Sequence, residues 1–264
     1  MNKLVQFKAM HQQDELLFLP NAWDLLSALV LEQCGFKALG TTSWGVANAM
    51  GYKDGENITF GDLAMLTKRI ISAVDIPVTV DIESGYSNDI KTIADNALRI
   101  AELGAAGINF EDSSKDSIGL IDVSKQIKLI EKIRGQLDNN GYSDFFINAR
   151  TDTYLLLENP FEETISRAKQ YIESGANGIF VPGLAQVDDI KKIVELIDIP
   201  LNLMSLPNLT DVDSLNKLGV KRFSIGNSLS DATTAFIEQQ SHQILTNKNT
   251  KNLYDHGGVK TVFA

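Results

Sequence analysis

The stretch at residues 78–87, VTVDIESGYS, joins a β-branched apolar run to two carboxylates and a glycine turn. Residues two apart on a strand point to the same face, so the pattern predicts that Asp81 and Glu83 project together from a strand end. Convergent carboxylates favour a hard cation. A second stretch, GINFEDS at residues 107–113, ends another apolar run on Glu111 and Asp112. We expect these two strand ends to form one acidic site.

The same alternation of a strand-like run and a helical stretch occurs eight times along the chain. The predicted strands cover residues 16–20, 37–43, 78–84, 107–112, 144–151, 178–183, 200–206 and 221–227. The predicted helices cover about residues 24–34, 62–74, 89–104, 123–137, 161–175, 187–197, 212–219 and 230–245, with a glycine-rich loop after the second strand. This pattern predicts an α/β fold with a parallel sheet closed into a (β/α)8 TIM barrel. A doubly wound open sheet is the alternative.

No linker or shift in composition divides the sequence. With 264 residues, 44% of them hydrophobic, the chain can bury a large core. We therefore expect a single barrel domain over residues 1–264, with a short C-terminal tail from about residue 246.

The composition narrows the classes of partner and compartment. A net charge of -10 argues against nucleic acid and anionic membranes as partners, and no apolar run is long enough to span a bilayer. The only cysteine, Cys34, is expected to pack in the core, and a chain without disulfides suits the cytoplasm. The histidines His11, His242 and His256 lie near the termini, which argues against a histidine metal site or a Ser-His-Asp triad.

In a barrel of this kind the chemistry lies at the carboxyl ends of the strands. Asp81, Glu83 and Glu111, with Asp54 on the loop after the second strand, are predicted to gather around Mg2+ or Mn2+. Because Mg2+ usually keeps several waters, some of these carboxylates can act through water. The alternative is that the acids cap the helices that follow, but Asp81 precedes a glycine turn, where capping does not explain it.

Other polar residues complete the predicted site. Arg150, in FFINARTD, can clamp a substrate carboxylate in bidentate fashion, or it can pair with Glu111 or Asp152. The candidates for contacts to a small carboxylate substrate are Thr42, Ser43, Trp44, Arg150 and Asn202. Lys115 is the lone cation on the loop after the fourth strand, where an ordinary solvated lysine is an equal alternative.

Taken together, the motifs PNAWD, TTSWGVANAMGYKDG, VDIESGYS, NFEDS and NART resemble the isocitrate lyase and phosphoenolpyruvate mutase superfamily over about residues 17–230. The resemblance implies a Mg2+-dependent barrel that cleaves or rearranges a C–C or C–P bond in a small 2-oxo or 2-hydroxy acid, through an enolate-like state. It also implies a homo-oligomer, a dimer or a tetramer.

The resemblance assigns roles to individual positions. The metal-holding aspartate falls on Asp81, and the other metal-site carboxylates fall on Glu83, Glu111 and Asp54. The oxyanion-binding amides fall on Ser43 and Trp44, and the arginine that binds the substrate carboxylate falls on Arg150.

The sequence departs from the lyases of this superfamily in one loop. They carry a cysteine acid in a Lys-Arg-Cys-Gly-His loop, where this chain has SSKDSIGLID with Lys115 as a stand-in for a catalytic residue. Glu83 stands where an aspartate is usual, which lengthens the side chain by one methylene and favours a water-mediated role. The competing hypotheses are a catalytically weak or inactive metabolite-binding barrel and a phosphate-binding synthase barrel. The second lacks a glycine-rich phosphate cradle after the seventh and eighth strands.

Overall fold

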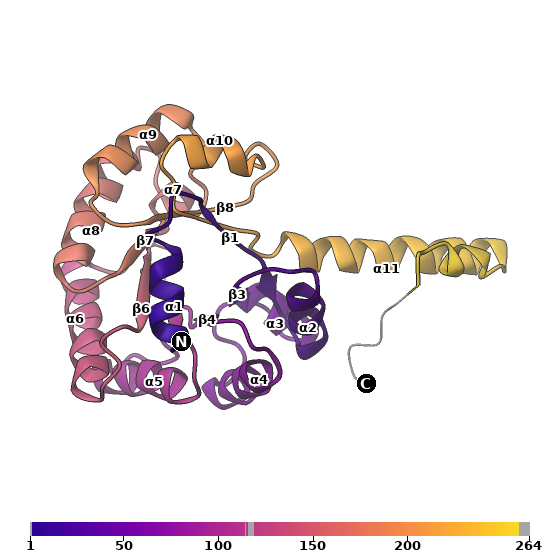
Figure 1. The fold of residues 1–264 in the computed structure, drawn as a ribbon, viewed down its shortest axis with the longest axis horizontal. Helices are drawn as coiled ribbons and strands as arrows, with labels where there is room; N and C mark the ends of the chain where they lie inside the picture. The colour runs from indigo at the N-terminus through magenta and orange to yellow at the C-terminus, as the bar shows by residue number, and fades with distance from the viewer. Residues whose placement is uncertain (1, 114, 116–118, 259–264) are drawn as a thin grey trace.

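The computed structural model describes residues 2–113, 115 and 119–258, and it shows a parallel β-barrel surrounded by helices (Figure 1). The strands are β1 (Leu17–Leu19), β2 (Asn21–Ala22), β3 (Leu39–Thr41), β4 (Val78–Asp81), β5 (Gly107–Glu111), β6 (Phe146–Arg150), β7 (Gly178–Phe180), β8 (Leu201–Met204) and β9 (Arg222–Ser224). The helices are α1 (Lys3–Met10), α2 (Leu25–Gln33), α3 (Ser43–Ala49), α4 (Phe60–Ala73), α5 (Ile90–Glu102), α6 (Val123–Asn139), α7 (Thr153–Leu156), α8 (Phe161–Glu173), α9 (Val187–Leu196), α10 (Val212–Lys217) and α11 (Ser228–Asn247). A short 3-10 turn, η1 (Lys251–Tyr254), follows α11.

The barrel closes because its first strand is divided in two at Pro20. β1 pairs in parallel with β9, whereas β2 pairs in parallel with β3, so the two halves join the two ends of the sheet. Proline has no N–H to donate to a ladder, but the Pro20 carbonyl accepts from the Gly40 N–H at 2.9 Å. The nine segments therefore occupy eight barrel positions, and the prediction of a (β/α)8 barrel rather than an open sheet is confirmed.

Two local expectations were wrong. The glycine-rich loop after the second predicted strand contains α3, which begins directly after β3 because Thr42 caps it by accepting from the Gly45 N–H at 3.4 Å. Cys34 is exposed rather than packed in the core. It is the residue that ends α2, and Gly35, with a φ of +97°, turns the chain away there, leaving the thiol at the surface.

Helix α1 covers the amino-terminal end of the barrel. Phe7 is fully buried and meets the ring of Phe146 at the start of β6, with ring centroids 5.7 Å apart. His11 stacks on the same Phe146 ring at 4.1 Å, and its Nδ1 lies 2.8 Å from the Phe7 carbonyl. Burial lowers the pKa of His11 to about 3, so this ring is neutral at physiological pH.

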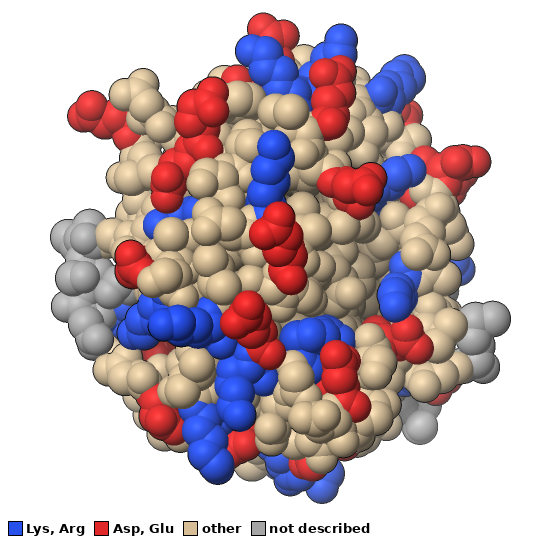
Figure 2. Space-filling view, turned by 90° about the vertical axis from the view of Figure 1, so that its left-hand side faces the viewer, with Lys and Arg blue, Asp and Glu red and all other residues tan. Residues whose placement is uncertain are grey.

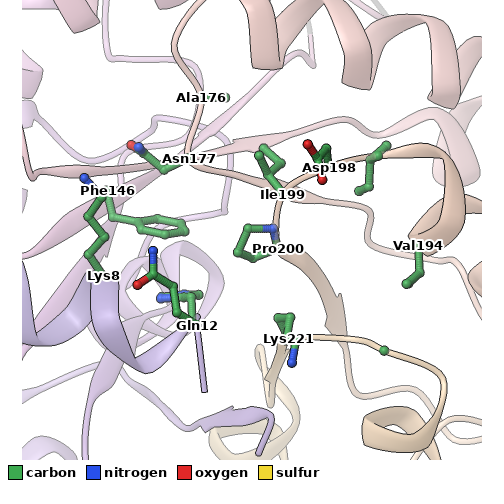
Figure 3. A pocket seen from close by; sticks show the side chains of 13 residues that line it. Lys8, Gln12, Phe146, Ala176, Asn177, Val194, Asp198, Ile199, Pro200 and Lys221 are labelled. Atoms are coloured by element: carbon green, nitrogen blue, oxygen red, sulfur yellow. The ribbon is translucent and has the colours of Figure 1, made fainter. Parts of the chain in front are cut away.

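A hollow of about 480 Å³ lies beside α1 at this amino-terminal end (Figure 3). It is bounded by Lys8 of α1 and Gln12 just after that helix on one side, and by the segment around Ile199 and Pro200 on the other. In barrels of this kind, residues at the amino-terminal end of the strands serve stability, whereas active sites lie at the carboxyl-terminal end. The functional site is therefore expected at the carboxyl ends of the strands, although the hollow there is smaller.

The outer surface carries both signs of charge. Figure 2 shows Lys and Arg interspersed with Asp and Glu over the face formed by the helices on the left of Figure 1. Among the described residues, no helix combines the length and apolar character needed to cross a membrane.

A buried ion pair fixes the end of β5 to helix α8. Asp112, which is fully buried, accepts from Arg167 Nη1 at 3.2 Å and from the Tyr171 hydroxyl at 2.7 Å. Arg167 Nη1 also donates to the Ile121 carbonyl at 2.9 Å. Because the Asp112 carboxylate cannot reach water, its stability depends on these donors.

We expect Arg167→Met to lower the free energy of unfolding by about 3–5 kcal/mol, because it leaves the Asp112 carboxylate buried without its cation. Urea denaturation followed by circular dichroism measures the change. Arg99→Met is the matched control, since Arg99 pairs with Glu102 at the surface, and it should cost about 1 kcal/mol or less. Equal losses in the two variants would contradict this account.

Candidate functional site

A cavity of about 150 Å³ opens at the carboxyl ends of the strands. Six of the residues predicted from the sequence line it together: Thr42, Ser43, Trp44, Asp54, Asp81 and Arg150. They come from the loops after β3 and from the ends of β4 and β6. The remaining predicted residues, Glu83, Glu111, Lys115 and Asn202, do not line this cavity.

Asp81 is the buried acid of the cavity. Its side chain accepts from two backbone N–H groups through long hydrogen bonds, from Ser43 at 3.4 Å and from Glu83 at 3.3 Å. Within the described part of the chain, no Lys, Arg or His side chain forms a salt bridge with it. Burial raises the pKa of Asp81 above its ordinary value, against the opposing effect of Arg150.

Glu83 does not share the face of Asp81, so the prediction from strand periodicity was wrong at this position. β4 ends at Asp81, and Glu83 has a φ of +48°, which turns it out of the extended conformation that the alternation of faces requires. Its carboxylate instead accepts from the Glu56 N–H, from the Tyr86 hydroxyl at 3.0 Å and from Lys115 Nζ at 3.0 Å.

Lys115 joins the two glutamates behind the cavity. Its Nζ lies 3.0 Å from Glu83 Oε2 and 2.7 Å from Glu111 Oε1. Burial would lower the pKa of Lys115, but the two carboxylates outweigh it and raise that pKa above its usual value. The ammonium is therefore charged, and it neutralises part of the acidic cluster.

Arg150 is held in a fixed orientation at the cavity wall. Its Nε and Nη2 donate to the two Asp152 oxygens at 2.6 and 3.1 Å, and its Nη1 lies 3.0 Å from Glu111 Oε2. The guanidinium carbon also lies 5.7 Å from the centre of the Phe180 ring. The ion pairs considered as an alternative from the sequence are thus present. A guanidinium has five N–H groups, so two remain for a ligand.

The start of α3 forms another wall. Ser43 directs its backbone N–H toward Asp81, and the Trp44 indole donates to Asp231 Oδ1 in α11 at 2.9 Å. Trp44 is 44% exposed. It is therefore tied to α11 rather than packed in the core, and it borders the cavity mouth.

The floor of the cavity and the barrel interior beneath it are polar. Asn109 Oδ1 accepts from Asn148 Nδ2 at 2.9 Å and from Arg222 Nη2 at 3.2 Å. Asn202 is 1% exposed and belongs to this buried layer, where it pairs in register with Arg222. Burial lowers the pKa of Arg222 to about 9, opposed by the Asp81 carboxylate, so Arg222 is a cation beneath the site.

The donor set fits a divalent cation that makes few direct protein contacts. Among the described residues, no three His, Cys, Asp or Glu side chains converge closely enough to hold a metal alone. However, Asp81 is a buried carboxylate without a side-chain cation, and Asp54 lines the same cavity. Mg2+ tolerates this arrangement because it keeps much of its water. Glu83 and Glu111, which lie farther back, suit contacts through water.

Sequence reasoning missed several lining residues, including Asn21, Asn109, Phe180 and Ser224. Asn109 could have been found, because it lies two residues before Glu111 on the same strand and opposite Asp81 in the register. Asn21 and Ser224 carried no such signal. They reach the cavity only because β1 and β2 bring the last and first parts of the barrel together.

Comparison with known proteins places this chain in a family. The family model described as Phosphoenolpyruvate phosphomutase matches residues 7–245. An uncharacterized protein of Mycobacterium tuberculosis is 39% identical over 84% of this chain and 82% of its own length. Oxaloacetate decarboxylase 1 of Pseudomonas fluorescens is 30% identical over 81% of this chain and 75% of its own length.

A solved structure shows the same fold. The crystal structure of 2,3-dimethylmalate lyase, described as a PEP mutase/isocitrate lyase superfamily member, has a TM-score of 0.86 and 20% identity. The match covers 100% of this chain and 92% of that one.

We expect Asp81→Asn to raise the free energy of unfolding by about 0.5–2 kcal/mol, because burial disfavours the charged form of Asp81. The pKa of Asp81 is higher in the folded than in the unfolded protein. Below the ordinary aspartate pKa, Asp81 is protonated in both the folded and the unfolded protein, so the penalty is absent; it grows as pH rises above that value. Denaturant unfolding at pH 7.5 and pH 4 measures the effect, and the gain should shrink at pH 4. Asp54→Asn is the control, because Asp54 is exposed. A loss of stability in Asp81→Asn at pH 7.5 would contradict this prediction.

Proposed function

This chain belongs to the phosphoenolpyruvate phosphomutase family, and on that premise we propose that it is a Mg2+-dependent lyase that cleaves a C–C bond in a small 2-oxo acid. The wider superfamily cleaves or rearranges C–C and C–P bonds in small acids, and lyase is the leading activity among the named relatives. The observation that carries the proposal is that a buried carboxylate without a cation, Asp81, and a fixed guanidinium, Arg150, line one small cavity.

The size of the cavity favours a short substrate. Pockets for drug-sized ligands measure about 300–1,000 Å³, so a cavity of about 150 Å³ suits an acid of a few carbon atoms. Arg150 is the one lysine or arginine among the described lining residues, so one substrate carboxylate meets a side-chain cation and a second would have to face the metal. A four-carbon 2-oxo diacid such as oxaloacetate meets both conditions better than a seven-carbon tricarboxylate.

We assign the metal to the acidic side of the cavity. Asp81 and Asp54 would hold Mg2+, with Glu83 and Glu111 acting through water. When bound, the ion supplies positive charge and Lewis acidity toward a 2-oxo oxygen. Mn2+ has the same ligand preference and can replace it.

The chain's own residues bind and orient the acid. Arg150, fixed by Asp152 and Glu111, offers its two remaining N–H groups to the substrate carboxylate. The backbone N–H of Trp44 would donate to the oxygen on which negative charge develops, which is the usual way to stabilise such a charge. The Ser43 N–H would join it by giving up its long contact to Asp81 Oδ2 at 3.4 Å. Thr42 holds these two residues in place by capping α3.

The residues present favour decarboxylation over cleavage of a 2-hydroxy acid. In decarboxylation of a 3-carboxy-2-oxo acid, the electron pair of the breaking C–C bond moves into the 2-oxo group and the carboxylate leaves as CO2, so the bond breaks before any proton is needed. The enolate that remains then takes a proton from water at its terminal carbon to give the shorter 2-oxo acid. Cleavage of a 2-hydroxy acid needs a base for the hydroxyl proton and an acid for the departing carbanion. Among the described lining residues there is no Cys, His or Lys to serve as either.

Lys115, predicted from the sequence as a catalytic residue, remains a prediction. It lies between Glu83 and Glu111, so its ammonium would have to leave both carboxylates to reach the cavity. The same contacts favour the competing proposal of a catalytically weak metabolite-binding barrel. Lys115 and Arg150 already neutralise Glu111, which leaves this carboxylate less charge to offer a metal. The two proposals differ in turnover and agree in ligand binding.

We also propose that the protein is a homo-oligomer, a dimer or a tetramer, joined through α11. This helix projects away from the barrel (Figure 1), and it exposes Phe236, Ile237 and Leu245 by 61%, 60% and 65%. A hollow of about 650 Å³ lies between α3 and α11. A second copy is the occupant that we assign, since its own α11 carries the same apolar face into an equivalent hollow.

We expect the protein with Mg2+ to release CO2 and pyruvate from oxaloacetate, and oxalate with Mg2+ to raise its melting temperature. Arg150→Met should lower kcat/KM by about 10²-fold or more, because the substrate carboxylate loses its cation. Arg134→Met is the control, as its guanidinium lies outside the cavity.

The substrate panel should include methylisocitrate and phosphonopyruvate, with products identified by mass spectrometry. Binding of oxalate without turnover of any compound would favour the metabolite-binding barrel. If oxalate with Mg2+ neither binds nor stabilises the protein, the site assignment fails.

Light scattering coupled to gel filtration tests the oligomer. We expect the wild-type protein at twice or four times the mass of one chain, and Phe236→Asp with Ile237→Asp to shift it to one chain, because two charges would face the apolar contact. Val187→Asp is the control, an equally exposed apolar residue on α9. A monomeric wild-type protein would contradict the proposal.

A further inference from the structure

Three residues with side chains adopt a left-handed backbone at the edge of the site. Glu56, Glu83 and Tyr86 have φ angles of 59°, 48° and 60°. Residues other than glycine rarely adopt this conformation unless surrounding contacts enforce it, and such strain gathers at functional sites. The three residues belong to two loops, one after α3 and one after β4, so the strain marks the point where these loops meet.

Two carboxylates tie the loops together, each binding the backbone of the other loop. The Glu56 N–H donates to both Glu83 oxygens, at 3.0 and 2.9 Å. In return, Glu56 Oε1 accepts from the Ser84 N–H at 3.0 Å, the Ser84 hydroxyl at 2.8 Å and the Tyr86 N–H at 3.0 Å. We call this reciprocal contact of Glu56 and Glu83 the carboxylate clamp.

The clamp lies next to a residue of the cavity. Asp54 lines the cavity and precedes Glu56 by two positions. Residues 50–54 of this loop are exposed, so no core packing holds them in place. The Asp54 carbonyl accepts from Asn57 Nδ2 at 3.1 Å, which closes a short turn beside the clamp.

We propose that Glu56 is a positioning residue that holds Asp54 against the cavity through the carboxylate clamp. The inference rests on the proposed function, because the role of Asp54 toward a cation belongs to it. It also explains the length of Glu83: a side chain one methylene shorter would not reach the Glu56 N–H. Glu83 therefore serves the site by fixing the neighbouring loop, in addition to any contact through water.

Two substitutions of Glu56 separate the effect of side-chain length from the effect of side-chain charge. Glu56→Gln keeps the length and the accepting Oε1 atom, whereas Glu56→Asp keeps the charge and loses one methylene. With Mg2+ and oxalate as probes in calorimetry, we expect Glu56→Gln to bind close to wild type and Glu56→Asp to weaken binding about tenfold or more, as loss of a supporting contact does. The reverse order would show that Glu56 acts as a ligand or through its charge, and would overturn the proposal.

A double-mutant cycle tests whether Glu56 acts through Asp54. Asp54→Asn should weaken binding, and adding Glu56→Asp to it should have little further effect, because the residue being positioned is already lost. Additive losses would overturn the proposal. Asp89→Asn is the matched control: Asp89 follows the same β4 loop and caps α5 by accepting from the Thr92 N–H at 2.8 Å, so its change should leave binding unaltered.

Hydrogen exchange gives a readout that needs no metal. The amides of residues 50–57 should exchange faster in Glu56→Asp than in wild type, Glu56→Gln or Asp54→Asn, because only the first opens the clamp. If the wild-type protein binds no Mg2+ with oxalate, the proposed function fails, and the exchange still decides whether the clamp holds the loop. Unchanged exchange in Glu56→Asp would overturn the inference.

Discussion

Buried negative charge at the barrel mouth is the constraint that organises the site. Asp81, Glu83, Glu111 and Asp152 are each less than a tenth exposed, and their mutual repulsion is strong where water is scarce. Two cations face them: Lys115 spans the two glutamates, and Arg150 lies between Glu111 and Asp152. This compensation leaves Asp81 without a side-chain partner, at the place where the cavity opens.

The barrel itself produces this concentration of charge. Parallel strands all end at one rim, so residues far apart in the chain become neighbours in the register, as Glu111 and Arg150 do across β5 and β6. Closure depends on the strand divided at Pro20, which pairs with β9 on one side and β3 on the other. The buried Arg222 then places positive charge beneath the acidic rim.

Strained loops hold the site residues that lie beyond the ends of the barrel strands. The loop after α3 has little apolar surface to bury, so hydrogen bonds to Glu83 and from Ser84 and Tyr86 hold it. Such a site lowers the stability of the fold but fixes the positions of its side chains. Residues in left-handed conformations and an unpaired Asp81 are both unfavourable in isolation. Both are found where the proposed chemistry needs fixed oxygens.

The eight-unit barrel and six of the lining residues could be predicted from the sequence, because apolar periodicity and strand-end position are local properties of the chain. Glu83 could not be placed that way, since its backbone is left-handed and its carboxylate binds the Glu56 N–H of another loop. Asn202 also needed the tertiary structure, because only the barrel's closure decides which strand-end residues point below the cavity and which reach it. Local pattern thus identified the rim, whereas contacts between distant segments decided which oxygens face the cavity.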